Sequence, residues 1–314
     1  MRGRGTRRFG PLVALAVAAA IAPAVPAPAA HVACGDTITA DTTLDGDLTG
    51  CPGNGVTIAA PGVTLDLGGH EIEGAPGGFG VVAQVPRVTV TNGSVGRFHN
   101  AVVLSSGGDH VVRDMTVYGS HDGVLLLAVH RALVERVTAH GNDGSGITAP
   151  TSSDVTFRDN HVFGNSGGIG GVGFERGALI GNLIERNLFY GLRYGQVHDS
   201  VFARNVVRGN GERGMSFEDD STGNVFTRNR VTANDGPGVL MSEDSSANVF
   251  YRNRSDRNAG VGFGLLGPGA ALTRNVAIGN AGLGFDAPSG AAVAERNKAH
   301  HNGDRRQCAG IPCR

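Results

Sequence analysis

The chain has 314 residues, of which 40% are hydrophobic, so it can bury a sizeable core and is not a disordered protein. Its 51 glycines, its lack of tryptophan and its 5% aromatic content favour an all-β protein with many turns. The 27 basic residues nearly balance 28 acidic ones, which gives a formal net charge of −1 and argues against a nucleic-acid partner.

Residues 1–30 have the three parts of a secretory signal peptide. A basic stretch, MRGRGTRRFG, precedes the apolar run PLVALAVAAAIAPAV and the small residues PAPAA. Cleavage near Ala29 or Ala30 would remove four Arg and no acidic residue, which takes the net charge from −1 to −5. No later segment is long enough for a transmembrane helix. We therefore expect an exported protein, secreted or held at the cell surface, that is monomeric.

Four cysteines lie in two pairs near the ends of the expected mature chain. In an exported protein four cysteines suggest two disulfides, for which three connectivities are possible. We expect the local pairs Cys34–Cys51 and Cys308–Cys313. The first would bracket an N-terminal cap and lead-in over residues 31–62, and the second a C-terminal cap over residues 304–314.

Between these caps the sequence repeats every 22–24 residues. Asparagines five positions apart recur at 160/165, 182/187, 205/210, 229/234, 253/258, 275/280 and 297/302. The same slot extends backwards through Asn142, so about eleven coils fill residues 63–303. A repeat of this period indicates a solenoid.

Each repeat contains three short strands and has no room for a helix. An apolar pair such as Val225-Phe226 is followed by an Asn bend and a second strand. A second Asn then opens a Gly-containing turn, and a third strand has the form Gly-h-x-h, where h is hydrophobic, as in GVLM (238–241). This order predicts a right-handed parallel β-helix whose coils stack about 4.8 Å apart.

Equivalent inward residues of such a solenoid stack into columns. We expect one apolar column from Phe157, Leu179, Phe202, Phe226, Phe250 and Leu272. The bend asparagines are expected to adopt left-handed backbone angles and to hydrogen-bond to the asparagine of the next coil.

The Asn-x4-Asn bends, the Gly-h-x-h strands and the segment LTGCPGNGVTIAAPGVTLDLGGHEIEG (48–74) resemble the pectin-lyase-like β-helix superfamily. More narrowly, they are similar to NosD-type and carbohydrate-binding or sugar-hydrolase β-helix domains. The resemblance covers nearly all of the expected mature chain and implies a substrate cleft along the outer face of one sheet. The Asp-Pro-His motif of the related mannuronan epimerases is absent, and so is the aspartate signature of polygalacturonases.

If that cleft follows the Gly-h-x-h strands, its outward positions carry Glu175, Arg193 and Glu218 on successive coils. Glu175 and Glu218 are expected in one column, roughly 9.5 Å apart along the backbone, which suits an inverting glycosidase. Arg193 would then hold a uronate carboxylate. The same residues fit a lyase or an epimerase, a ligand-binding surface, or a plain exposed ion-pair network.

Other turn and bend positions offer further substrate contacts. His99, His121, Asp122, Tyr190 and Arg213 precede the Gly-h-x-h strands, and His121 beside Asp122 has the composition of a general base. An arginine column, Arg204, Arg228, Arg252, Arg274 and Arg296, precedes the first Asn of successive coils. Stacked like charges repel, so these arginines either contact a polyanion or form a solvated face.

Asp219, Asp220, Glu243 and Asp244 lie on adjacent turns, where four carboxylates could bind Ca²⁺. Acidic turns that only confer solubility are the alternative, and no cofactor is expected to be required. The resemblance to NosD-type domains suggests a link to copper, but no Cys/His pattern with metal-ligand spacing supports it.

Two functions remain open from the sequence. One is an exported enzyme acting on an acidic polysaccharide, as a lyase, C5-epimerase or inverting hydrolase centred on Glu175, Arg193 and Glu218. The other is a non-catalytic glycan-binding or cell-surface structural module. The central Glu and Arg residues favour the first, whereas the uniformly short turns favour the second.

Overall fold

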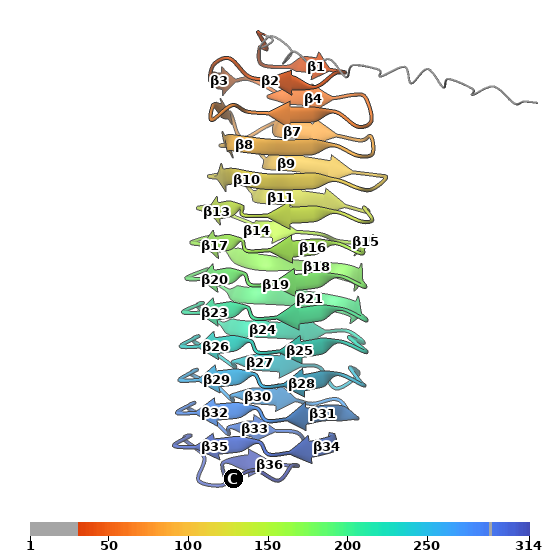
Figure 1. Ribbon diagram of the computed structural model, residues 1–314. Helices are drawn as coiled ribbons and strands as arrows, with labels where there is room; N and C mark the ends of the chain where they lie inside the picture. Colours follow the sequence, from red (N-terminus) through yellow and green to blue (C-terminus); the bar gives the residue numbers. More distant parts are fainter. Residues whose placement is uncertain (1–30, 289–290) are drawn as a thin grey trace, which may run out of the picture.

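The computed structural model describes residues 31–288 and 291–314, so the predicted signal peptide, residues 1–30, lies outside the described residues. The described part is all-β and winds through about twelve turns of a right-handed parallel β-solenoid, which confirms the predicted fold. Its coils stack into a single column with β1 at one end and the C-terminus at the other (Figure 1). Among the described residues, no helix is long and apolar enough to cross a membrane.

Three sheets run along the column, and each coil contributes a strand to each of them. Sheet A contains the Gly-h-x-h strands. Its members are β1 (Asp36–Ile38), β4 (Val56–Ile58), β7 (Phe79–Ala83), β9 (Asn100–Ser105), β11 (Asp122–Leu127), β14 (Ser145–Thr148), β18 (Gly167–Glu175), β21 (Tyr190–His198), β24 (Arg213–Glu218), β27 (Val239–Met241), β30 (Phe263–Leu265), β33 (Phe285–Asp286) and β36 (Cys308–Ala309), with β15 (Ser152–Ser153) paired to β18.

Sheet B contains the strands with the apolar pairs. Its members are β2 (Thr42–Thr43), β5 (Thr64–Asp66), β8 (Thr89–Gly96), β10 (Val111–Tyr118), β12 (Leu133–Glu135), β16 (Thr156–Arg158), β19 (Ala178–Ile180), β22 (Val201–Ala203), β25 (Val225–Thr227), β28 (Val249–Tyr251), β31 (Ala270–Thr273) and β34 (Ala291–Glu295). The eight-residue strands β8 and β10 continue into sheet C.

Sheet C follows the first Asn of each coil. Its further members are β3 (Leu48–Cys51), β6 (Glu71–Gly74), β13 (Thr138–His140), β17 (His161–Phe163), β20 (Leu183–Glu185), β23 (Val206–Arg208), β26 (Arg230–Thr232), β29 (Arg254–Asp256), β32 (Val276–Ile278) and β35 (Lys298–His300). The strands β1 to β4 already make one coil, within the segment expected to form the N-terminal cap.

The predicted apolar column is confirmed. Its six residues pair in register from β16 through β31, and each is at most 1% exposed. The rings of Phe226 and Phe250 stack with centroids 4.5 Å apart, which is close to the spacing of neighbouring strands. The register of the coils therefore brings identical rings into face-to-face contact.

The bend asparagines form buried ladders along the column, also as predicted. The Asn229 amide donates to Oδ1 of Asn253 at 2.9 Å and to the carbonyl of Phe202 at 2.7 Å. The predicted left-handed angles, however, belong to the preceding residue, with φ of 56° at Arg204 and 55° at Arg228. The exposed residue makes the bend because the asparagine must point inward to join the ladder.

The glycine of the Gly-h-x-h strand leaves room for that ladder. A Cβ on Gly214 would lie 2.4 Å from Cγ1 of Val231 and 2.8 Å from Nδ2 of Asn234. Any larger residue would therefore push against the asparagine of the next coil.

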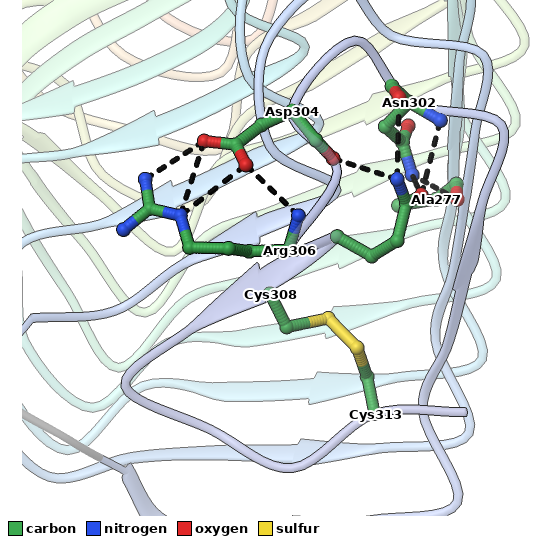
Figure 2. The surroundings of a disulfide bond; sticks show 7 residues. Ala277, Asn302, Asp304, Arg306, Cys308 and Cys313 are labelled. Atoms are coloured by element: carbon green, nitrogen blue, oxygen red, sulfur yellow. Dashed lines mark hydrogen bonds and ion pairs between the residues drawn. A yellow bond between two sulfur atoms is a disulfide. The ribbon is translucent and has the colours of Figure 1, made fainter.

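Both expected disulfides, Cys34–Cys51 and Cys308–Cys313, are present near the two ends. At the C-terminal end Gln307 completes the asparagine ladder, because its Oε1 accepts hydrogen bonds from the backbone and the amide of Asn302 at 3.0 and 2.9 Å. Figure 2 shows this region, with Asn302 donating to the Ala277 carbonyl at 3.1 Å and Arg306 paired with Asp304 at 2.7 Å, beside the Cys308–Cys313 disulfide.

Removing one rung of either column should destabilise the solenoid. We expect Asn229→Ala to lower the free energy of unfolding by about 1–3 kcal/mol for each buried group left without a partner. Phe226→Ala should cost about 3–5 kcal/mol because it leaves a cavity in the core. Urea unfolding followed by circular dichroism measures both. The exposed Lys298→Ala is the control, expected within about 0.5 kcal/mol of wild type, and equal effects of all three substitutions would contradict the ladder interpretation.

Candidate functional site

A groove lies on the outer face of sheet A, over the strands β14, β18, β21 and β24. Its cavity of about 270 Å³ is lined by Ser145, Thr148, Gly170, Gly171, Val172, Tyr190, Arg193, Gly195, Glu218 and Asp219. Glycines and Thr148 form its floor on the N-terminal side, so side chains from β21 and β24 stand beside an open space. We call this space the sheet A groove.

Two arginines converge on Glu218 at the C-terminal side of the sheet A groove. Nε and Nη2 of Arg193 donate to Oε2 of Glu218 at 3.2 and 3.0 Å. Nη1 of Arg213 donates to Oε1 at 2.9 Å, and the Ser216 hydroxyl donates to the same oxygen at 3.2 Å. The carboxylate thus fixes both guanidinium groups, which line a neighbouring cavity of about 200 Å³ together with Tyr190.

The pKa of Glu218 reflects two opposing effects. Partial burial disfavours the ionised carboxylate, but the hydrogen bond and charge of Arg193, with help from Ser216 and Arg213, outweigh it and hold the pKa of Glu218 below its ordinary value. The same contact raises the pKa of Arg193. Glu218 is therefore ionised at neutral pH and cannot serve there as the acid of a glycosidase.

Tyr190 connects these charges to the floor of the groove. The guanidinium of Arg193 lies 5.8 Å from the centroid of the Tyr190 ring, within cation–π range. The Tyr190 hydroxyl lies 3.3 Å from Oγ of Ser145, two coils away. Gly167 allows this reach, because a Cβ there would lie 2.5 Å from the tyrosine ring and hydroxyl.

The expected column of Glu175 and Glu218 is wrong. In register, Glu218 pairs with Gly195 and Gly195 with Val172, whereas Glu175 pairs with His198 three positions further along. Glu175 instead forms an ion pair with Arg176 at 2.9 Å.

The cause of this shift lies within β18. In its sequence GGIGGVGFE only GVGF (171–174) has the Gly-h-x-h form, but the structure places the earlier segment GIGG (168–171) in that row, with Ile169 opposite Leu192 and Gly171 opposite Tyr194. Val172 is consequently 53% exposed rather than inward. Glu175 thus lies outside the group of residues that line the sheet A groove.

The predicted histidines lie together at an edge of sheet A. The rings of His99 and His121 stack with centroids 5.2 Å apart, and Nδ1 of His121 lies 2.7 Å from Oδ1 of Asp143. The expected partner Asp122 instead accepts a hydrogen bond from the backbone N–H of Ser145 at 2.8 Å. The carboxylate beside His121 therefore comes from the next coil and not from the adjacent residue.

The arginine column lies at the corner between sheets B and C, so the structure does not bring it into the sheet A groove. Arg204, Arg228 and Arg252 are exposed. Arg252 lies 5.0 Å from the centroid of the Tyr251 ring. In the part of the chain that the structure describes, none of these three forms an ion pair with a carboxylate, and the column remains a cationic stripe.

The predicted calcium ligands do not form a recognisable cage. Within residues 31–288 and 291–314, no group of three or more His, Cys, Asp or Glu side chains is placed to hold a metal ion. Asp220 accepts a hydrogen bond from the Thr222 hydroxyl at 3.0 Å, and Asp244 accepts one from Ser242. Asp219 and Glu243 are exposed on the same turns.

Sequence reasoning missed Ser145 and Gly167. Both occupy the row that holds Tyr190 and Arg213, with Ser145 opposite Gly167, Gly167 opposite Tyr190 and Tyr190 opposite Arg213. The signal for Ser145 was its position directly before the glycine of a Gly-h-x-h strand, whereas Gly167 precedes GIGG (168–171), which lacks the second hydrophobic residue of that form.

The comparisons with known proteins agree on the fold. Residues 100–254 match the family described as the right handed beta helix region. The chain is similar to a crystal structure of the Dettilon tailspike protein, with 16% identity and a TM-score of 0.52 over 79% of this chain and 55% of that one. It is also similar to the periplasmic alginate epimerase AlgG, with 15% identity and a TM-score of 0.50 over 83% of this chain and 66% of that one. No curated protein matches it in sequence. The chain thus spans 55% and 66% of these two solved structures, and the likeness concerns the fold.

The lowered pKa of Glu218 predicts a pH-dependent contribution to stability. Because the folded-state pKa lies below the ordinary value of 4.5, the stabilisation is present above that pH and is lost as the pH falls through the folded pKa. Wild type should therefore exceed Glu218→Gln in melting temperature at pH 7, and the difference should shrink towards pH 3. Thermal melts at each pH measure this. Glu212→Gln, an exposed neighbour, is the control, and a difference independent of pH would contradict the prediction.

Proposed function

We propose that this chain, a member of the right-handed parallel β-helix superfamily, binds an acidic polysaccharide in the sheet A groove. The observation that carries the proposal is the convergence of Arg193 and Arg213 on Glu218 beside an open floor of small residues. A cation pair held rigidly beside free space is the arrangement that recognises a carboxylate or a similar anionic group.

Both arginines retain donors for a ligand. A guanidinium has five N–H donors, and Arg193 uses only its Nε and Nη2 atoms on Glu218. Glu218 therefore orients the two arginines without using up their hydrogen-bonding capacity. The face of the Tyr190 ring, which is partly exposed in the same cavity, offers an apolar surface against which a sugar ring can pack.

An exported location fits this ligand. The two disulfides are stable in oxidising compartments, and the expected signal peptide over residues 1–30 would direct export. The periplasmic alginate epimerase AlgG, which the chain resembles in fold, supports the same class of ligand.

A second candidate is catalysis of proton transfer at C5 of a uronate. The specific observation in its favour is the Tyr190 hydroxyl, which lies in the same cavity as Arg193 and 3.3 Å from the Ser145 hydroxyl. Arg193 would neutralise the uronate carboxylate and so acidify the C5 proton, which the phenolate form of Tyr190 would take. Elimination then breaks the C4–O4 bond, leaves a C4–C5 double bond and passes the proton from Tyr190 to the departing O4, whereas in epimerisation water returns a proton to C5 from the opposite face. An inverting hydrolase is not proposed, because Glu175 lies in a different column.

Loss of either arginine should weaken polysaccharide binding. We expect Arg193→Ala and Arg213→Ala each to raise the Kd for an acidic polysaccharide at least about tenfold, since an ionic hydrogen bond contributes about 1.5–3 kcal/mol. Calorimetry against alginate, pectate and glycosaminoglycans measures this, with dextran as the neutral ligand. Arg131→Ala, which removes an arginine paired with Asp109 at a distant corner, is the matched control. Equal affinity for dextran, or unchanged affinity in both groove variants, would overturn the binding proposal.

Tyr190→Phe separates binding from catalysis. If the tyrosine transfers the proton, the variant should keep its affinity within about threefold and lose at least about 100-fold in turnover. Unsaturated products in ultraviolet absorbance report elimination, and uronate ratios in NMR spectra report epimerisation. Turnover that survives in Tyr190→Phe would remove this residue from the mechanism. Binding without any turnover in wild type would assign the protein to the non-catalytic class.

A further inference from the structure

A second cavity lies on sheet C, away from the sheet A groove. It has a volume of about 590 Å³ and spans the strands β20, β23 and β26. Its lining residues are Glu185, Arg186, Val206, Arg208, Gly209, Arg230, Thr232, Ala233 and Arg257. We call it the sheet C cavity. Its size falls within the range of small-molecule sites, which is about 300–1,000 Å³.

The charges of the sheet C cavity are unevenly distributed. At its N-terminal side Glu185 is buried and receives hydrogen bonds from Arg208 at 2.6 Å and Arg186 at 2.7 Å. At its C-terminal side, Arg230 and Arg257 are exposed, and neither forms an ion pair with a described carboxylate. The arginines at the N-terminal side of the cavity are thus paired with Glu185, whereas the two arginines at the C-terminal side have no described carboxylate as a counterion.

The space in the cavity comes from a row of small residues at the corner between sheets C and A. Arg186, Gly209, Ala233 and Arg257 occupy equivalent positions on four successive coils, as their backbone hydrogen bonds to the following coil show. Coils lie about 4.8 Å apart, so Arg186 and Arg257 are separated by roughly 14 Å along the row. Gly209 and Ala233 leave the interval between them open.

The floor of the cavity contains a polar group without a partner. Thr232 is only 6% exposed, and its buried hydroxyl forms no hydrogen bond within the described residues. Buried polar atoms are normally paired, and a buried hydroxyl without a partner costs stability. Oδ1 of Asp256, which is next in register, also lacks a partner, while its Oδ2 accepts from Arg254. The charge of Asp256 is therefore matched by Arg254, and the Thr232 hydroxyl remains free to donate.

We propose that the sheet C cavity is a second binding site, specific for a phosphate or sulfate group. A planar carboxylate is satisfied by a single guanidinium fork, whereas a tetrahedral oxyanion has at least three acceptor oxygens for several arginines. Arg230 and Arg257 supply the uncompensated charge, Arg208 lies between Glu185 and the open space, and Thr232 donates the remaining hydrogen bond. This site does not depend on the function proposed for the sheet A groove.

Calorimetric titration of the whole chain with inorganic phosphate, sulfate and acetate tests the class of ligand. Phosphate or sulfate should bind saturably and at least about tenfold more tightly than acetate, because only the tetrahedral anions engage several arginines. Glucose 6-phosphate and dextran sulfate distinguish the source of the group. Tighter binding of either one indicates an anion carried on a larger molecule, and equal binding indicates the free ion. Absence of saturable binding by every anion, or equal affinity for acetate, would overturn the proposal.

Substitutions of residues that line the sheet C cavity test whether the anion binds there. We expect Arg230→Gln and Arg257→Gln each to weaken phosphate binding at least about tenfold, and Thr232→Val, which keeps the shape of the side chain, to weaken it several-fold. Arg131→Gln is the control and should bind phosphate like wild type. Unchanged affinity in both Arg230→Gln and Arg257→Gln would overturn the assignment.

Melting temperatures measured with and without phosphate distinguish a binding role of Arg230 from a purely structural role. Arg230 lies directly opposite Arg254 in the parallel register, so the two like charges repel. Without phosphate, Arg230→Gln should therefore melt at the wild-type temperature or above it. With phosphate, wild type should gain in melting temperature and the variant should gain less. A gain of equal size in both proteins would contradict the proposal.

Discussion

The buried asparagine ladder is the interaction on which the rest of this structure depends. Each rung joins one coil to the next through an amide and a backbone N–H that both reach the same Oδ1, as Asn205 does with Asn229 at 3.0 Å. A buried amide that loses its partner is costly, so every coil must keep the register of its neighbour. A slip by one residue would also turn the apolar column outward. The ladder therefore fixes where each outward side chain stands, and with it the geometry of both candidate sites.

The scaffold and the candidate sites use different positions of the same repeat. The residues that recur, such as Phe226 and Asn229, point inward and are almost fully buried. The residues that differ between coils point outward, where the register stacks them into rows. Such a row can hold charged side chains, apolar side chains or glycines that leave space. In the row of the sheet A groove, Gly170 is opposite Arg193, so an absent side chain creates space directly beside a cation. In the sheet C cavity, Gly209 likewise leaves space beside Arg186. A binding site on such a solenoid is thus a local exception to the repeat.

The fold could be predicted from the sequence because its determinants are periodic. The spacing of the asparagines defines the coil length, and the Gly-h-x-h strands identify sheet A. The position of Glu175 could not be predicted in the same way. Within GGIGGVGFE only GVGF matches the local pattern, but contacts with the neighbouring coil, such as Ile169 with Leu192, place the strand three residues away from the register that this match predicts. The sequence identifies Arg193 and Glu218 as parts of one centre, and Tyr190 and Arg213 as further candidates outside it. Their convergence depended on side-chain conformations that the repeat does not encode.

The corners of the column differ in how their charges are arranged. At the corner before sheet B, Asp109 pairs with Arg131 and Asp154 with Arg176, so adjacent coils carry opposite signs. At the corner between sheets B and C, the later coils repeat Arg204, Arg228 and Arg252 with the same sign. Like charges at the coil spacing repel, and the asparagine ladder has to hold the coils together against that repulsion. The later half of sheet C is therefore bordered by arginines at both edges, with Arg257 and the sheet C cavity at one and the arginine column at the other. A bound anion would relieve this repulsion, so the stability of these coils and their affinity for anions are coupled by the same charges.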